Sequence, residues 1–221
     1  MLLSKNPDAV KKLREEHDRV FHLDFEETLT ILDEYPYKLN ELEYTTAVIK
    51  ETLRLFPIGF GLRQADEEYV ALASVKNWTA DVHSSTLTYN DQTFPIGNNL
   101  AVTALPLGLH YDPEVYPDPS KFEPERFLGD NPMPRNAFRT FSRGARACLG
   151  QNLAIEMLRV ILLLTVRDYD FECAGLKPNA TPRASYTTLD TIYGDIVFQE
   201  LGLAAKPRGG MMMTVSKHVK A

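Results

Sequence analysis

A ten-residue stretch, residues 141–150, constrains this chain most, because it runs directly into an apolar segment of helical length, residues 151–166. The stretch is polar and rich in arginine, and it contains the single cysteine Cys148. We expect Cys148 at or just before a helix N-terminus, where free backbone N–H groups and the positive end of the helix dipole gather. This setting favours the thiolate, the form of cysteine that binds metals. Gly144 and Gly150 allow the backbone to turn tightly and to approach a flat partner closely.

The cysteine has two interpretations. A lone cysteine is usually a small buried hydrophobe, and this chain has only Cys148 and Cys173. Alternatively, a single thiolate held by such a loop suits the axial ligand of a haem iron. The complete pattern is Phe-x-x-Gly-x-Arg-x-Cys-x-Gly, and its fixed positions are Phe141, Gly144, Arg146, Cys148 and Gly150. It resembles the haem-binding loop of the cytochrome P-450 family. The resemblance implies that the cysteine is the proximal iron ligand, that the arginine meets a haem propionate, and that the phenylalanine packs beside the sulfur.

A second motif lies in the segment before Pro57. Glu51 and Arg54 are three residues apart, so they share a helix face and can pair. A random pair of this kind is usually a surface ion pair of little value. Here the sequence resembles the Glu-x-x-Arg helix of the same family, and Phe-Glu-Pro-Glu-Arg-Phe at residues 122–127 supplies the third member, Arg126. The hypothesis is that these three residues hold the cysteine loop in position and take no part in the chemistry.

Three further features remain open at this level. Arg63 ends a strand-like segment, residues 58–63, and by resemblance it would reach a propionate; the alternative is a solvent-exposed arginine. His110 has no second histidine or cysteine nearby in sequence, which favours a structural hydrogen-bonding role over a metal site. Residues 131–152 contain four arginines and no acid, so they form either a solvated basic loop with propionate ligands or a docking face for an acidic electron donor. The four are Arg135, Arg139, Arg143 and Arg146.

Composition limits the class of protein. The net charge of −6 argues against nucleic acid as a partner, and 44% hydrophobic residues in 221 fit a globular chain. Two cysteines form no secreted disulfide framework, which favours a reducing compartment. The apolar run at the N-terminus stops after Leu3, so we predict no signal peptide and no membrane segment.

The periodicity predicts an α+β fold that is mainly helical, with small antiparallel sheets. Helices are expected over residues 7–18, capped by Asn6, over 24–33 and from 39 or 40 to 55, and a core helix over 153–166. Prolines exclude long helices from residues 107–119. Strands are expected at residues 58–63, 100–103 and 169–173, with a hairpin over 86–94 that turns at Asn90 and Asp91. The resemblance to the family implies two late strands, at residues 194–197 and 211–215.

The resemblance covers almost the whole chain but only the C-terminal half of the family's fold, so residues 1–221 are expected to form a partial domain. The N-terminal membrane anchor and the distal helix with its oxygen-activating pair are expected to be absent. The implied function is a haem-thiolate monooxygenase with haem b, which oxidises an apolar organic substrate with dioxygen and electrons from an NADPH-dependent reductase or a similar donor. The implied location of full-length relatives is the cytosolic face of the endoplasmic reticulum membrane, whereas for a chain without the anchor the location is cytoplasmic or unknown. The alternatives are a truncated, catalytically silent fragment or a haem-binding module without oxygenase activity.

Overall fold

The computed structural model describes residues 1–22, 24–59, 61–64, 85–89, 91–96, 101–129, 134, 136–201 and 204–219. The chain forms two compact units, Met1–Gly59 with Pro106–Ala221, and Phe60–Leu105. The described part of the chain is mainly helical with small two-stranded antiparallel sheets, which confirms the predicted fold class. In that part, none of the helices combines the length and the apolar character that crossing a membrane requires.

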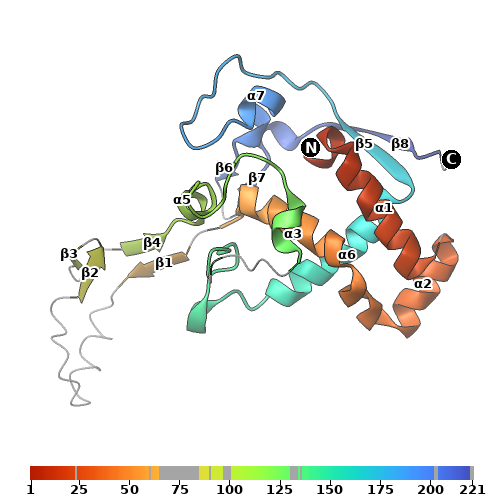
Figure 1. Ribbon diagram of the computed structural model, residues 1–221, viewed down its shortest axis with the longest axis horizontal. Helices are drawn as coiled ribbons and strands as arrows, with labels where there is room; N and C mark the ends of the chain where they lie inside the picture. The colour runs from red at the N-terminus through yellow and green to blue at the C-terminus, as the bar shows by residue number, and fades with distance from the viewer. Residues whose placement is uncertain are drawn as a thin grey trace. The chain divides into compact units, whose positions relative to one another are not determined.

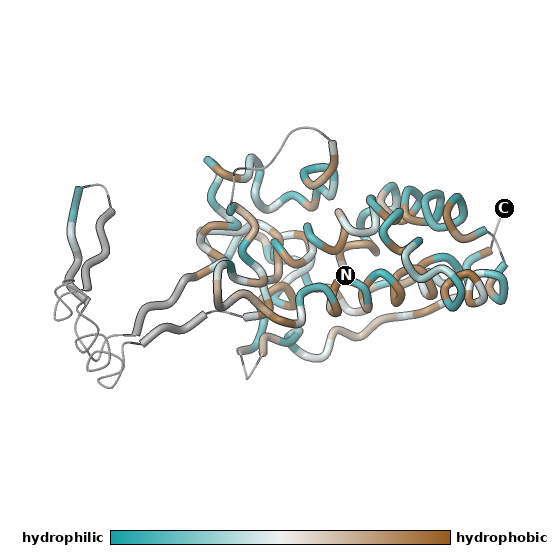
Figure 2. Tube along the Cα trace, turned by 90° about the horizontal axis from the view of Figure 1, so that it is seen from below, coloured by the Kyte–Doolittle hydropathy of each residue, from teal (hydrophilic) through white to brown (hydrophobic). Residues whose placement is uncertain are grey.

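Three long helices of the first unit pack against one another: α1 (Pro7–Phe21), α3 (Glu43–Leu55) and α6 (Gln151–Val166) (Figure 1). Figure 2 shows both hydrophilic and hydrophobic residues in the helical part of the first unit, as expected for helices that bury one face. Leu13, Val48 and Val166 form a buried cluster at their meeting point, one from each helix. The shorter helices of this unit are α2 (Phe25–Glu34), α5 (Pro106–His110) and α7 (Asp190–Tyr193).

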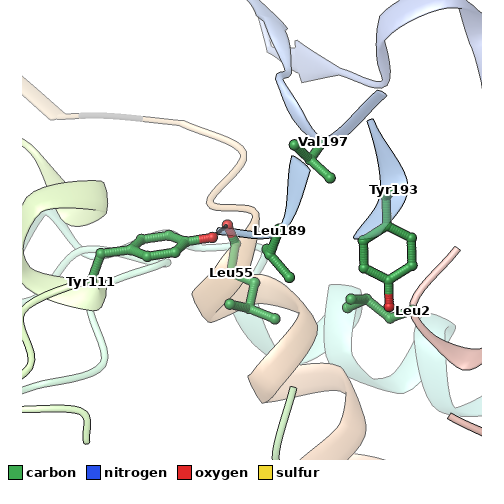
Figure 3. Packing of buried hydrophobic residues seen from close by; sticks show 6 residues of the cluster. All are labelled: Leu2, Leu55, Tyr111, Leu189, Tyr193 and Val197. Atoms are coloured by element: carbon green, nitrogen blue, oxygen red, sulfur yellow. Dashed lines mark hydrogen bonds between the residues drawn. The ribbon is translucent and has the colours of Figure 1, made fainter. Parts of the chain in front are cut away.

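A second apolar cluster joins the C-terminal end of α3 to distant segments. Figure 3 shows Leu55 near Tyr111 and Leu189, with Leu2, Tyr193 and Val197 completing the cluster. Short 3-10 helices connect the larger elements: η1 (Leu3–Lys5), η2 (Pro36–Glu41), η3 (Pro124–Phe127), η4 (Gly144–Arg146), η5 (Asp195–Val197) and η6 (Arg208–Gly210). In the same unit β5 (Tyr169–Cys173) pairs with β8 (Met213–Lys217), and β6 (Glu200–Leu201) pairs with β7 (Ala205–Lys206).

In the described part of the second unit, the strands form two antiparallel pairs. Strand β1 (Gly61–Gln64) pairs with β4 (Ala101–Ala104) in the register Leu62 to Thr103. Strands β2 (Ser85–Tyr89) and β3 (Gln92–Ile96) form the predicted hairpin, and the pairing of Tyr89 with Gln92 leaves a two-residue turn. The predicted strand at residues 58–63 is therefore a strand only from Gly61 onward.

The capping of one helix and the start of another differ from the sequence prediction. Helix α1 begins at Pro7 as expected and ends at Phe21, but the Asn6 side chain donates to the Leu2 carbonyl and caps nothing. Helix α3 begins at Glu43 because the residues from Pro36 form η2, so the predicted start at residue 39 or 40 was wrong. Helix α2 is close to its predicted range, and Asp24 caps it by accepting a hydrogen bond from the Glu27 N–H.

The C-terminal part also differs from the prediction. Residues 194–197 are not a strand, because Gly194 has a φ of 76° and lies against the Lys177 backbone. A Cβ on Gly194 would lie 2.1 Å from the Lys177 carbonyl oxygen, so the close approach requires glycine. The predicted strand at 211–215 is shifted to Met213–Lys217, since Met211 adopts a left-handed conformation.

Helix α6 spans nearly its predicted range, but it is not buried all round. Leu163 and Val166 are buried, whereas Leu153, Met157 and Ile161 are 66%, 55% and 51% exposed. Residues four apart share one face of a helix, so the exposed residues form one apolar stripe. The prediction failed because a uniformly apolar helix does not reveal which of its faces will find a packing partner.

Candidate functional site

Helix α3 is held at its N-terminus by a side chain from α1. The buried carboxylate of Glu16 accepts hydrogen bonds from the backbone N–H groups of Tyr44 and Thr45, at 2.7 and 2.8 Å, and from the Thr45 hydroxyl at 2.6 Å. Leu42, the residue just before the first residue of α3, forms no capping hydrogen bond with its side chain. Glu16 therefore does what an N-cap residue usually does, and its negative charge also suits the positive end of the helix dipole.

Glu51 and Arg54 form a two-bond ion pair within α3. Arg54 Nε donates to Glu51 Oε2 at 2.7 Å and Arg54 Nη2 donates to Oε1 at 2.8 Å, and both side chains are fully buried. Burial excludes the alternative of a weak surface ion pair. A bidentate charge-assisted pair of this kind is geometrically specific. Oε1 also accepts the backbone N–H of Glu123 at 3.0 Å, which ties α3 to the segment before η3.

Arg126 joins this pair from η3. Its Nε lies 3.5 Å from Glu51 Oε1, and its Nη2 pairs with Glu123 at 2.9 Å and donates to the Asp118 carbonyl. Its side chain is 9% exposed, and Arg54 is fully buried. The structure thus brings together the three residues that the motif match selected, with one carboxylate between two guanidinium groups.

The C-terminus of α3 is joined to the segment that leads to Cys148. The last carbonyl groups of a helix lack intrahelical partners, and here three side chains supply them. The Thr140 hydroxyl donates to the Leu53 carbonyl at 2.9 Å, His110 Nδ1 lies 3.0 Å from the Arg54 carbonyl, and the Tyr111 hydroxyl donates to the Leu55 carbonyl at 3.1 Å. The loop that leads to Cys148 is therefore attached to the C-terminal end of α3 through Thr140.

The loop itself closes on Cys148. The Cys148 N–H donates to the Phe141 carbonyl at 2.9 Å, and η4 lies between these two residues. Gly144 has a φ of 79°, so the turn favours glycine at that position as the sequence suggested. Gly150, by contrast, has a φ of −84° and precedes α6, and an added Cβ would lie 3.9 Å from the Cys148 sulfur. Its conformation alone does not require glycine.

Cys148 is exposed, as are its neighbours Arg143 and Leu149, and α6 begins three residues later at Gln151. Its position just before a helix N-terminus agrees with the expectation from sequence. Cys173 is buried on β5, which fits its interpretation as a packing residue.

The remaining predicted site residues are only partly placed. Arg146 ends η4, and its side chain lies outside what the structure describes. Arg63 lies in β1 of the second unit, so its proposed contact with a propionate stays a prediction. Arg135 falls outside the described residues. Arg139 is half-buried and its Nε donates to the Asn136 carbonyl, whereas Arg143 is exposed.

Two buried histidines next to this framework are neutral. Burial lowers the pKa of His110 to about 4. The hydrogen bond from the ring to the Arg54 carbonyl raises this pKa, and the Arg54 charge lowers it by a smaller amount. Burial and the Arg167 charge lower the pKa of His17 to about 3. His110 has the hydrogen-bonding role expected from sequence. Glu16 and Thr140 were missed, because their partners are backbone groups of α3 far away in sequence.

The chain is similar to known proteins over nearly its whole length. A family model described as "Cytochrome P450" matches residues 1–72 and 82–191. The chain is 35% identical over 223 aligned positions to the cytochrome P450 monooxygenase PC-23 of Penicillium crustosum, covering 100% of this chain and 98% of that protein. It is 34% identical to the cytochrome P450 monooxygenase ptmG of Penicillium ochrochloron, covering 100% of this chain but 37% of that protein.

Similarity extends to a mammalian sequence and to a solved structure. The chain is 33% identical to mouse cytochrome P450 4A10, over 76% of this chain and 28% of that protein. The solved structure of retinoic acid-bound cyanobacterial CYP120A1 matches with a TM-score of 0.65 and 22% identity, covering 98% of this chain and 40% of that chain. The chain thus spans well under half the length of these relatives, although it spans nearly all of PC-23.

Proposed function

The chain belongs to the cytochrome P450 family, a family of haem-iron monooxygenases, and on that premise we propose that Cys148 is the proximal ligand of a haem iron. The observation that carries the proposal is the exposed Cys148 sulfur, presented by a loop that closes on the Phe141 carbonyl and is tied to α3. We further propose haem b as the form, with Phe141, Gly144, Arg146 and Gly150 lining its proximal side and Arg63 meeting a propionate.

The residues of this chain would have two roles, binding the haem and holding the cysteine loop in position. The Cys148 thiolate would donate electron density to the metal, and cationic side chains of the loop would neutralise the anionic edge of the group. Glu51, Arg54 and Arg126 keep the loop in register and touch neither metal nor substrate. When bound, the haem supplies the redox chemistry by which oxygen from dioxygen is transferred to an organic substrate.

For substrate and electrons we propose an apolar small molecule and an NADPH-dependent reductase or a similar donor. No residue of this chain is proposed to deliver protons to oxygen, and the chain is proposed as the proximal, C-terminal portion of the P450 fold. Because it covers 37% of ptmG and 40% of CYP120A1, turnover by this chain is itself part of the proposal. A silent fragment and a haem-binding module without oxygenase activity are the rival outcomes.

The visible spectrum of the reduced, carbon monoxide-treated protein with added haem tests the ligand. We expect a strongly red-shifted Soret band for the wild type and for Cys173→Ala, and its loss in Cys148→Ala. Cys173 is the matched control because it is the second cysteine and is buried on β5. Absence of the shifted band in the wild type would refute haem-thiolate binding by this chain, and an unchanged band in Cys148→Ala would refute the assigned ligand.

The electron donor is proposed to dock on the cysteine side. A cavity of about 350 Å³ opens between α3, η3 and the loop, and Lys50 and Arg143 are among its lining residues. A basic surface of this kind steers an acidic partner, and steering weakens with salt. We expect Arg143→Glu to slow reduction by an acidic donor and to reduce its ionic-strength dependence, with Lys206→Glu as an exposed control. Reduction rates independent of both salt and Arg143 would refute the docking face.

A further inference from the structure

His110 connects the ion-pair helix to the cysteine loop through both of its ring nitrogens. Its Nδ1 lies 3.0 Å from the Arg54 carbonyl oxygen, and its Nε2 accepts the backbone N–H of Arg139 at 3.0 Å. The Arg54 guanidinium donates in turn to the His110 carbonyl at 2.7 Å. The ring is fully buried, stacks on Phe138 at 5.8 Å and meets Tyr116 edge-on at 6.0 Å. Four separate contacts therefore fix its position.

The two hydrogen bonds determine the protonation state of the ring. A backbone N–H can only donate, so Nε2 must carry a lone pair, and a carbonyl can only accept, so Nδ1 must carry the proton. His110 is therefore the neutral Nδ1–H tautomer. A protonated ring would place an N–H against the Arg139 N–H, and that contact would be lost.

We propose that His110 is a positioning residue that fixes the loop carrying Cys148 to the end of α3, and that it can do so only as the neutral tautomer. The inference rests on the proposed role of Cys148 as the iron ligand. The path from the ring to the sulfur is short: Arg139 is next to Thr140, which is bonded to α3, and Phe141 accepts the Cys148 N–H.

The charged and titratable groups around the ring favour the neutral form. From α3 the Arg54 guanidinium faces it, and the Glu51 carboxylate is already engaged by Arg54. From the segment after α5 comes Tyr116, whose pKa burial raises to about 12 and which is therefore uncharged at neutral pH. From the loop, Arg139 offers its backbone N–H while its side chain bonds to Asn136. A proton on His110 would thus add a buried cation beside an existing one.

Two variants separate the hydrogen bonds from the packing. His110→Phe keeps a ring to stack on Phe138 but removes both polar atoms, whereas His110→Gln retains an acceptor and a donor and does not titrate. His17→Gln is the matched control, because His17 is also fully buried and neutral but bonds to Thr45 at the other end of α3. Hydrogen exchange of the backbone across residues 136–143 is measured first, since it needs no haem.

At pH 7 we expect His110→Phe to speed exchange of the Arg139 amide by about tenfold, the equivalent of one lost hydrogen bond. His110→Gln and the control should leave exchange at Arg139 within about twofold of the wild type, a difference too small for a lost hydrogen bond. Unchanged exchange in His110→Phe would overturn the inference whatever the haem result.

The second readout is the pH at which the haem-loaded protein loses the red-shifted band. We expect His110→Gln to keep it to lower pH than the wild type does, and His110→Phe to show less of it at pH 7. Identical acid profiles for wild type and His110→Gln would overturn the requirement for a neutral ring. A wild type that never shows the band, together with faster exchange in His110→Phe, would refute the haem proposal and leave the anchoring role of His110 supported.

Discussion

Glu51 is a fully buried carboxylate between two guanidinium groups. The effect of replacing it on stability therefore depends on the charges of the arginines that remain in the site. In Glu51→Gln the buried Arg54 guanidinium keeps its charge but loses its carboxylate partner, and Arg126 keeps its pair with Glu123 alone. We expect the free energy of unfolding to fall by about 3–5 kcal/mol, and haem incorporation to be lost with it.

Denaturant titration measures this effect, and α6 offers a matched control. Glu156 and Arg159 have the same three-residue spacing, but the Glu156 side chain is 41% exposed. Glu156→Gln should cost less than about 1 kcal/mol. Equal losses in the two variants, or normal haem content in Glu51→Gln, would contradict the supporting role of the network.

The two glycines of the loop should respond differently to alanine. Gly144 has a φ of 79° and open space around its Cα, so only backbone strain opposes a side chain there. We expect Gly144→Ala to reduce stability by about 1–2 kcal/mol. Gly150 has a negative φ of −84°, which residues other than glycine also adopt, and Gly150→Ala should change the free energy of unfolding by less than about 0.5 kcal/mol. Thermal and denaturant unfolding of the two variants measure these losses of stability. A larger loss in Gly150→Ala than in Gly144→Ala would contradict the described loop conformation.

Helix α3 depends on another helix for its first turn. Removing the Glu16 carboxylate leaves the N–H groups of Tyr44 and Thr45 without their acceptor. We expect Glu16→Ala to lower the free energy of unfolding by about 2 kcal/mol, the upper range for a lost cap. Glu15→Ala is the control, because Glu15 is exposed and its ion pair with Lys11, at 3.9 Å, is weak. This variant should lower the free energy of unfolding by less than about 0.5 kcal/mol. Similar costs for the two would exclude the capping role.

At the level of the folded molecule, the two buried histidines make stability depend on pH. Burial lowers the pKa of His17 to about 3 and of His110 to about 4, below the ordinary value of 6.5. The unfolded chain therefore binds more protons between these values, so stability is full above pH 6.5 and falls as the pH decreases toward 3–4. Each such proton contributes a slope of up to about 1.4 kcal/mol per pH unit. Denaturant titrations at pH 5, 6 and 7 give the free energy of unfolding as a function of pH. This free energy should change less with pH in His17→Gln than in the wild type, and an equal change would contradict the lowered pKa of His17.

The apolar stripe of α6 should make the isolated chain self-associate. Leu153 and Ile161 are more than half exposed and lie on one helix face, and exposed apolar surface of this kind favours association. We expect the double variant Leu153→Lys, Ile161→Lys to sediment as a smaller species at high concentration with little change in stability. Leu163→Ala, at a buried position of the same helix, should instead cost about 2–5 kcal/mol. A wild type that stays monomeric at high concentration would refute the prediction.

The sequence alone determined the local features of this protein, because they depend on residues close together in the chain. The loop from Phe141 to Gly150, the Glu51 and Arg54 pair, and the hairpin with its two-residue turn could all be read from spacing and residue type. The family resemblance then added Arg126, whose approach to Glu51 no local pattern predicts.

Only the tertiary structure decided how these parts are joined. Glu16 caps a helix that begins 27 positions later, at Glu43, and His110 links the Arg54 carbonyl to the Arg139 N–H. These partners are backbone groups, which every residue carries, so the sequence does not identify them. Likewise, the apolar pattern of α6 showed that it needs burial but not that one face stays exposed, because burial depends on which other elements reach that face.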